Sequence, residues 1–144
     1  MERARDKIPM DLNHLSSDII KAAINVHKEL GPGLLESVYQ VCMAKELSTM
    51  GKKVQAEVLF PIYYKDEIVQ NEGFRLDLLI DETIIVELKS VAQIQEVHKK
   101  QLLTYLRLAK KPLGLLINFN EVLVRDGITR IINSPIAKES PPEA

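Results

Sequence analysis

Three charged residues interrupt two apolar segments in the middle of the chain. Asp77 lies within FRLDLLI, and Glu87 and Lys89 lie within TIIVELKS. Residues two positions apart on a strand face the same side, so Glu87 and Lys89 are expected to lie together. The leucine and isoleucine residues around them are typical of strands buried on both faces, where a charge needs a partner or a chemical role.

The turn between the two segments decides whether Asp77 joins Glu87. Both segments have the composition of β-strands, and they flank the acidic turn Asp81-Glu82-Thr83. A three-residue loop pairs Ile80 with Ile84. It then places Asp77 directly opposite Glu87, with Cβ atoms roughly 5 Å apart. A two-residue loop would instead place the two carboxylates on opposite faces of the hairpin.

Carboxylates held this close repel and raise each other's pKa unless a cation lies between them. Hard oxygen ligands suit Mg²⁺ or Mn²⁺, so the hairpin predicts a divalent metal site at Asp77 and Glu87. The alternative interpretation is that Glu87 and Lys89 form a pair on a solvated strand face. Asp77 would then be an unrelated charge on the neighbouring strand.

A third carboxylate is expected on a helix. Glu36 shares one helical stripe with residues at offsets of three, seven, eleven and fourteen, namely Tyr39, Met43, Leu47 and Met50. This stripe predicts that Glu36 lies on the buried face, where it could be another oxygen ligand. The alternative is a first-turn glutamate that interacts with the N-terminus of its helix. The glycines before it, Gly31 and Gly33, would let the chain approach the sheet closely.

A later helix combines a polar face with a basic strip. Gln101 and Tyr105 are one turn apart and share a face. Lys100, Arg107 and Lys111 project from another side, and no acidic residue interrupts the segment 98–111. Beside a carboxylate–metal site this strip would attract phosphates; otherwise it is the solvated side of an amphipathic helix.

The elements around these residues predict an α/β fold that opens on two helices. Periodicity predicts helices from Leu15 to Leu30 with Ser16 or Ser17 as N-cap, from about Leu34 to Met50, and from about Ile94 to Ala109. Beyond the hairpin, strands are expected at 54–60 with Pro61 as an interruption, at 62–64, at 113–119, at 122–124 and at 128–132. Turns are expected at Asp66-Glu67 and Asn71-Glu72-Gly73.

The composition describes one ordinary globular domain. The 144 residues include 19 Lys and Arg against 20 Asp and Glu, for a formal net charge of −1. This balance argues against a protein that coats nucleic acid through bulk charge, although a local basic face remains compatible with it. We expect a flexible N-terminal arm over 1–14, a domain over 15–133 and a disordered tail over 134–144.

Several other classes are excluded by what the sequence lacks. It has one cysteine, no paired Cys/His spacing for zinc, no phosphate-cradling glycine loop and no nucleophile-elbow motif. No apolar run approaches the roughly 20 residues of a membrane span, and the N-terminal segment lacks the apolar stretch of a signal peptide. A cytoplasmic protein without a membrane partner is expected.

Five separated segments, in collinear order, resemble the GxxExxR proteins, a branch of the PD-(D/E)xK nuclease-like superfamily. They are LGPGLLESVY, GFRLDLLI, IIVELKSV, QLLTYL and GLLINF, at 30–39, 73–80, 84–91, 101–106 and 114–119. The resemblance implies a restriction-endonuclease-like fold, a central mixed β-sheet flanked by helices. Tyr39 stands where the family name places an arginine, and Arg130 could supply positive charge in its place.

The resemblance also implies the roles of individual residues. Asp77 and Glu87 match the metal-binding acids, Lys89 the catalytic lysine and Glu36 the helix glutamate. Gln101 and Tyr105 match the Gln-x-x-x-Tyr of RecB-like exonucleases. The expected function is therefore a Mg²⁺- or Mn²⁺-dependent nuclease acting on DNA or RNA without sequence specificity. The alternative is a non-catalytic module of the same fold that binds nucleic acid or a protein partner. Among partners we also consider a homo-oligomer or another protein.

Overall fold

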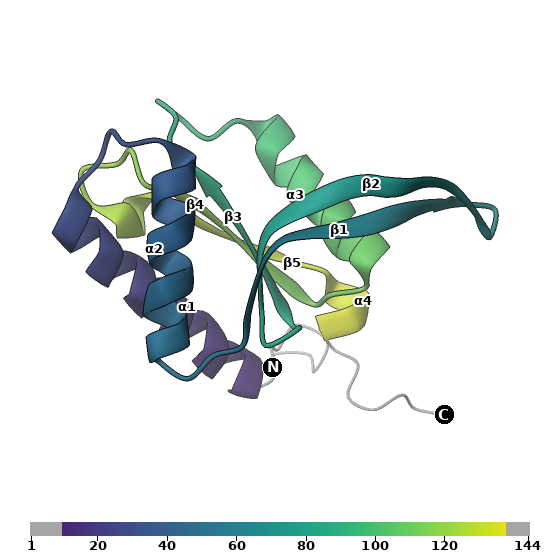
Figure 1. Ribbon diagram of the computed structural model, residues 1–144, viewed down its shortest axis with the longest axis horizontal. Coiled ribbons are helices and arrows are strands. Elements are labelled where there is room, and N and C mark those ends of the chain that lie inside the picture. The colour runs from purple at the N-terminus through teal and green to yellow at the C-terminus, as the bar shows by residue number, and fades with distance from the viewer. Residues whose placement is uncertain (1–9, 138–144) are drawn as a thin grey trace, which may run out of the picture.

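The computed structural model describes residues 10–137, which form a central five-stranded sheet with helices on both faces (Figure 1). The strand order is β1-β2-β3-β4-β5; β3 and β4 are parallel and the other neighbouring pairs are antiparallel. The expected mixed α/β architecture with two N-terminal helices is confirmed. The elements are α1 (Met10–Leu30), α2 (Glu36–Thr49), β1 (Val54–Tyr64), β2 (Glu67–Ile80), β3 (Ile84–Lys89), α3 (Glu96–Ala109), β4 (Leu113–Asn118), the 3₁₀ helix η2 (Val124–Gly127), β5 (Ile128–Ile132) and α4 (Ser134–Ala137).

The first helix is longer than the sequence pattern predicts. It begins at Met10, so the expectation that residues 10–14 belong to a loose arm is wrong; the rest of that segment, 1–9, lies outside the described residues. Ser16 is not an N-cap, because it lies inside the helix and is buried. Within the described residues no helix is both long and apolar enough to cross a membrane.

Each face of the sheet packs in its own apolar cluster. On the α1 and α2 side, Val86 and Leu88 of β3 pack with Ile19, Tyr39 and Met43. On the α3 side, a second cluster contains residues from β2, β3 and β4 together with the helix, namely Leu79, Ile85, Leu116, Leu102 and Leu106. Because strand residues alternate between faces, the positions of Glu87 and Ile85 on β3 assign both to the α3 side.

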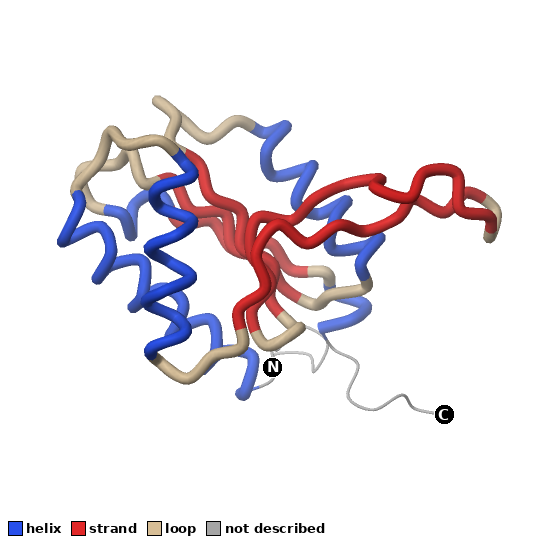
Figure 2. Tube along the Cα trace, viewed as in Figure 1, coloured by secondary structure: helices blue, strands red, loops and turns tan. Residues whose placement is uncertain are grey.

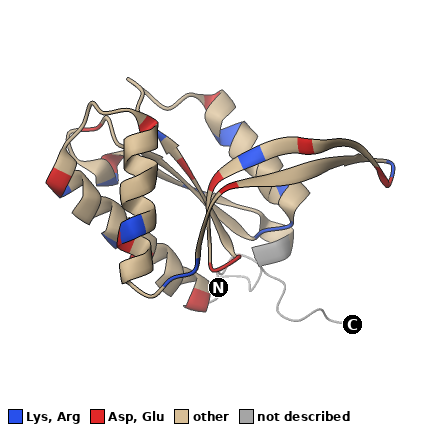
Figure 3. Cartoon of the chain, in the orientation of Figure 1, with Lys and Arg blue, Asp and Glu red and all other residues tan. Residues whose placement is uncertain are grey.

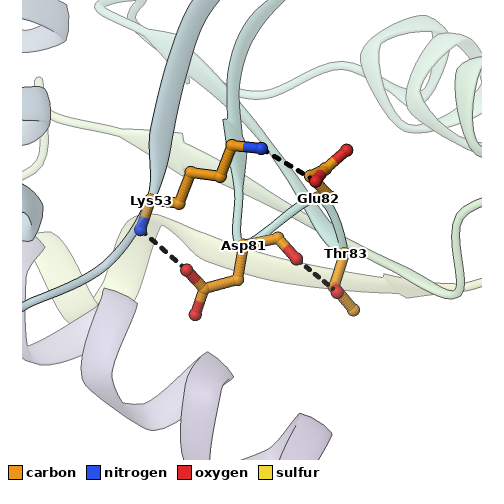
Figure 4. A network of polar contacts seen from close by, with 4 residues as sticks. All are labelled: Lys53, Asp81, Glu82 and Thr83. Carbon is orange, nitrogen blue, oxygen red and sulfur yellow. Dashed lines mark hydrogen bonds and ion pairs between the residues drawn. The ribbon is translucent and has the colours of Figure 1, made fainter.

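The β2–β3 hairpin has a three-residue loop, the one of the two expected lengths that places Asp77 opposite Glu87. Ile80 pairs with Ile84, and Asp81, Glu82 and Thr83 form the turn between them. Figure 4 shows how the turn is fixed: the Lys53 N–H donates to Asp81 Oδ1 (2.7 Å), its Nζ binds Glu82 (2.8 Å), and the Thr83 hydroxyl donates to the Asp81 carbonyl (2.7 Å). The register that brings Asp77 towards Glu87 is therefore set by this loop.

The β1–β2 pair continues as a long twisted ribbon that projects from the body (Figures 1 and 2). The predicted turn at residues 71–73 is wrong, because β2 runs through it and the ribbon turns at Lys65 and Asp66. Pro61 does not end β1 but marks a shift in register, since Phe60 pairs with Phe74 while Ile62 pairs with Gln70. We call the outer part of this ribbon, residues 59–73, the β1–β2 extension.

Gly73 explains how the ribbon tolerates this shift. A Cβ placed there would lie 2.6 Å from the Phe60 carbonyl oxygen and 2.8 Å from the Ile62 nitrogen. The close backbone approach at the bulge thus requires glycine. Gly73, which the sequence pattern assigned to a turn, instead allows the two strands to approach closely at the register shift.

The end of the chain differs from expectation in two places. β4 is fully buried as predicted, but residues 122–124 do not form a strand; η2 begins at Val124 and leads into β5. The expected disordered tail begins with the short helix α4, and residues 138–144 of that segment lie outside the described part.

Candidate active site

The acidic pair lies where β2 and β3 separate. The regular pairing between these strands runs from Ile80 and Ile84 to Leu78 and Val86. At the next position the Asp77 N–H donates to Glu87 Oε2 (2.9 Å), and the Leu88 N–H donates to Asp77 Oδ2 (2.8 Å). Carboxylate oxygens thus replace carbonyl oxygens as acceptors at the end of the ladder, which holds the two acids together as the sequence predicted.

At the same position, the side chains of the β1–β2 ribbon change from one face of the sheet to the other. Glu57 lies between Ala56, which pairs with Leu78, and Val58, which pairs with Leu76, so it stands opposite Asp77 on β1. Its φ of 51° is in the left-handed region, which is uncommon for a residue with a side chain. On the inner side of this point Val54 packs on the α1/α2 side, and on the outer side Val58 packs on the α3 side. The twist therefore carries β2 away from β3 at Asp77, directly after the last regular pair of the two strands.

Glu87 is the most perturbed acid of the site. Its residue is only 6% exposed. Burial, and next the charge of Asp77, raise the pKa of Glu87 to about 8, although the Asp77 N–H and Lys89 act in the opposite direction. Near neutral pH this carboxyl is therefore largely protonated unless a cation lies beside it.

Asp77 is half-buried and shares this environment. Burial raises its pKa, while the hydrogen bond from Leu88 and the charges of Lys89 and Arg75 oppose the rise. Lys89 follows on β3, is half-buried and pairs with Asn118 of β4. The predicted set of two acids and a lysine is thus brought together. The charge of Lys89 acts on both acids, and that of Arg75 acts on Asp77.

Glu36 reaches the edge of this site from α2, but it is not buried as predicted. Tyr39 and Met43 on the same stripe are fully buried, whereas Glu36 is exposed in the first turn. Glu36 Oε2 accepts a hydrogen bond from the Ser90 N–H (3.3 Å), and its charge contributes to raising the pKa of Asp77, mainly set by burial. The stripe turns towards solvent at its N-terminal end, so Glu36 sits at the rim.

Tyr39 holds the loop that presents Glu36. Its hydroxyl donates to the Gly31 carbonyl (2.6 Å) and accepts from the Leu34 N–H (3.1 Å), while its ring stacks on Phe119 at 4.4 Å. An arginine here would have to bury a charge among apolar neighbours. Tyr39 therefore has an internal role, in which it binds the loop before Glu36.

Two polar residues that the sequence analysis did not select fix the chain after Lys89. The Ser90 hydroxyl donates to the Leu34 carbonyl (2.7 Å). Buried Asn118 accepts from the Val91 N–H (3.1 Å) and donates to the Val91 carbonyl (2.9 Å). Asn118 carried a signal that could have been used, because it is the one polar residue of an otherwise apolar, fully buried strand.

Of the two predicted site residues on α3, Gln101 and Tyr105, it is Tyr105 that lies at the site. Its ring stacks on Phe74 at 4.6 Å, and burial, followed by the charges of Glu87 and Asp77, raises its pKa. Gln101 lies one turn earlier on the same side of the helix and is exposed. Tyr105 therefore borders the acidic pair, while Gln101 lies further out along that helix face.

The basic strip of α3 does not line the site. Arg107 is two residues from Tyr105, which places it about 200° around the helix, and Lys100 is displaced from Tyr105 by about 140°. Lys111 lies after α3, and its charge helps to lower the pKa of Glu82, which is lowered mainly by the hydrogen bond from Lys53. That turn is at the opposite end of β3 from Lys89. The expected phosphate-attracting strip beside the acids is therefore wrong for Arg107 and Lys111.

Arg130 is also remote from the acids. It pairs with Leu115, whose side chain packs on the α1/α2 side, and its guanidinium donates to Asn13 Oδ1 on α1 (3.0 Å). Paired residues on neighbouring strands face the same side, so Arg130 lies on the sheet face opposite Glu87. Arg75, two residues before Asp77, is the arginine that the structure brings near the acids.

The donor chemistry suits a hard divalent cation, although the predicted set of three carboxylates is not assembled. Each of Asp77 and Glu87 uses one oxygen to accept a hydrogen bond from a backbone N–H, and burial raises the pKa of both acids. Over residues 10–137 no three acidic, histidine or cysteine side chains form a metal-binding group, so Glu36 does not complete one. The oxygens of Asp77 and Glu87 nevertheless fit an oxygen-binding cation, because the nearby charges of Lys89 and Arg75 do not offset the effect of burial on these acids.

Comparison with known proteins agrees with this arrangement. A search of curated proteins gives no match. A family model described as the PD-(D/E)XK nuclease superfamily matches residues 13–131, which include both acids, Lys89 and the whole sheet except its last residue. The chain therefore belongs to the PD-(D/E)XK nuclease superfamily.

Proposed function

We propose that this protein is a metal-dependent nuclease that hydrolyses phosphodiester bonds without sequence specificity. The observation that carries the proposal is the buried pair of Asp77 and Glu87 at the point where their strands part, with Lys89 beside them. Such a pair has little structural purpose, because the same positions filled by apolar residues would cost no desolvation.

Asp77 and Glu87 would hold one or two Mg²⁺ or Mn²⁺ ions, with Glu36 adding negative charge from the rim. When bound, the metal lowers the pKa of a water molecule and neutralises charge on the phosphate. The backbone N–H groups of Asp77 and Leu88 keep the two acids oriented towards that position. Burial makes both acids gain from a cation, since their ionised forms are otherwise poorly solvated.

Lys89 and Tyr105 would act on the substrate itself. The Lys89 ammonium would orient the attacking water and stabilise charge on the phosphate oxygens. The Tyr105 hydroxyl keeps its proton at neutral pH, because its pKa is raised, and so serves as a hydrogen-bond donor. Gln101 would contact the substrate further along the same face of α3.

Arg75 would supply the cationic grip that the basic strip of α3 does not. It is exposed, lies two residues before Asp77, and is held loosely by Glu57 at 3.7 Å. A guanidinium suits a phosphate because it can donate two parallel hydrogen bonds. Contacts of this kind position the backbone without reading bases, which is why no sequence specificity is proposed.

Within the superfamily we place the chain in the GxxExxR branch. Gly33 and Glu36 stand at the first two named positions, and Tyr39 at the third. The Tyr39 hydrogen bonds to Gly31 and Leu34 hold the loop before Glu36, which supports this placement despite the missing arginine.

A non-catalytic module of the same fold is the second candidate. It is favoured by the incomplete ligand set, because Glu36 and the acidic pair form no three-residue metal group among the described residues. Such a module would bind nucleic acid or a protein without cleaving it.

Cleavage assays separate the two. Purified protein is incubated with single- and double-stranded DNA and with RNA, in Mg²⁺, Mn²⁺ or chelator. Activity is expected only with metal, and Asp77→Asn and Lys89→Ala should each lower it by at least about 100-fold. Lys28→Ala, an exposed change on α1, should leave it unchanged. Cleavage that survives both site variants would indicate a contaminant, and metal-independent binding without cleavage would favour the second candidate.

A further inference from the structure

The β1–β2 extension exposes an unusual number of large apolar side chains. Five of them are between 51% and 64% exposed, namely Leu59, Tyr63, Tyr64, Ile68 and Val69. Figure 1 shows the extension reaching beyond the layers of the body, so none of the helices within residues 10–137 covers its outer end. Apolar side chains gathered on one projecting element are typical of an interaction surface.

The charges of the extension indicate what kind of partner it fits. Its residues include three acids, Asp66, Glu67 and Glu72, and one base, Lys65. Figure 3 shows these charges along the ribbon and at its tip. A net negative, apolar element is poorly suited to a polyanion and well suited to a basic protein surface with apolar walls.

The same chain carries such a surface. A groove between the C-terminal half of α3 and the β5–α4 junction has apolar walls and two bases, and it is lined by Leu103, Ile132, Pro135, Asn133, Arg107 and Lys110. Among residues 10–137, those that line the groove include no acid. Arg107 of the basic strip, which does not line the acidic site, thus lines this groove together with Lys110.

Hydrogen bonds from Asn133 hold the two sides of the groove together. Buried Asn133 donates from Nδ2 to the Leu106 carbonyl (3.3 Å) and to the Lys111 carbonyl (3.1 Å). The Asn133 N–H donates to the Pro112 carbonyl (2.9 Å). The end of α3 is thereby fixed to the end of β5, so the bases are presented on a rigid support.

We propose that this groove receives the β1–β2 extension of a second copy of the chain, giving a two-fold symmetric dimer. Each copy contributes one extension and one groove, so the interface closes on itself. The extension and α4 lie at the same end of the molecule in Figure 1, which allows both contacts to form at once. Arg107 lies on the side of α3 turned away from Tyr105, so the dimer leaves the acidic pair open.

The test measures the mass of the full chain by analytical ultracentrifugation over a wide concentration range. A dimer that weakens with salt is expected. Reversing the charge of the extension with Asp66→Lys and Glu67→Lys, or of the groove with Arg107→Glu and Lys110→Glu, should weaken association at least about tenfold. Combining all four changes on one chain should restore it, because the complementary charges are exchanged.

Matched controls change exposed residues outside both surfaces. Lys28→Glu on α1 and Val122→Ser after β4 should leave the dimer intact, and circular dichroism checks that every variant is folded. A wild-type chain that stays monomeric overturns the proposal. A dimer unaffected by either charge reversal also overturns it, as does a monomer whose extension variants lose only nucleic-acid binding.

Discussion

The backbone N–H of Asp77 donates a 2.9 Å hydrogen bond to the carboxylate of Glu87. In return the carboxylate of Asp77 accepts from the residue after Glu87 (2.8 Å). Each acid is therefore oriented by the backbone of the opposite strand. This reciprocal arrangement holds the two carboxylates together, while burial raises the pKa of both acids.

The first prediction concerns stability and pH. The pKa of Glu87 is about 8 in the folded protein, against an ordinary value of 4.5, so the folded protein binds more protons than the unfolded chain between these two pH values. Without metal the free energy of unfolding should then fall as pH rises from about 5 to 8, by up to about 1.4 kcal/mol per pH unit from this group. Urea unfolding at a series of pH values measures the slope.

Glu87→Gln provides the comparison for that slope, because it keeps an acceptor for the Asp77 N–H but cannot ionise. The variant should lose most of the fall and be more stable than the wild type at pH 8.5. Glu29→Gln, at an exposed position on α1, should behave as the wild type does. A wild-type protein whose stability rises over this interval would show that Glu87 is not buried as a protonated acid.

The second prediction is that a divalent cation stabilises the fold independently of activity. Mn²⁺ or Mg²⁺ should raise the melting temperature at pH 8, because a ligand that binds only the folded state adds its binding free energy. The shift should be smaller at pH 6, where protons compete for Glu87. In Asp77→Asn it should nearly vanish; an equal shift in that variant would place the cation elsewhere.

The third prediction concerns the loop before Glu36. Tyr39→Phe leaves the ring on Phe119 but removes the hydroxyl from the Gly31 carbonyl and the Leu34 N–H, so it should cost about 1–3 kcal/mol of stability. Amide exchange at Leu34 should become faster. Tyr63→Phe, at an exposed tyrosine of the extension, is the matched control and should change neither quantity.

The fourth prediction distinguishes the arginines. Arg75→Ala should weaken binding of an oligonucleotide in chelator about tenfold at low salt and reduce the slope of log Kd against log salt by about 1. Glu57→Gln should strengthen binding, because it releases Arg75 from its ion pair. Arg130→Ala should have little effect, and a loss as large as that for Arg75→Ala would contradict the placement of Arg130 on the far face.

Much of the architecture was accessible from the sequence because it depends on local rules. The period of α2 and α3 and the apolar run of β4 identified these elements correctly. The exceptions have tertiary causes. Gly73 was read as a turn signal but permits a close backbone contact within β2, and η2 replaces the strand expected at residues 122–124.

The site was predictable where it rests on strand geometry and not where it rests on packing. Opposition of Asp77 and Glu87 depends on the length of one turn, for which the sequence left two or three residues open and the structure has three. The exposure of Glu36 did not, because a helical stripe states which residues share a face and not where the neighbouring sheet ends. For the same reason Arg107, close in sequence to Tyr105, lies on the other side of the helix.

The sequence by itself determined that two acids and a lysine share a hairpin within a mixed α/β domain, since alternation and turn length act over a few residues. Only the tertiary structure decided that β1 and β2 turn over at Glu57 and Asp77, that Tyr39 closes the loop before Glu36, and that Arg75 rather than Arg130 accompanies the acids. These relations join residues distant in sequence through burial and twist, which no local pattern specifies.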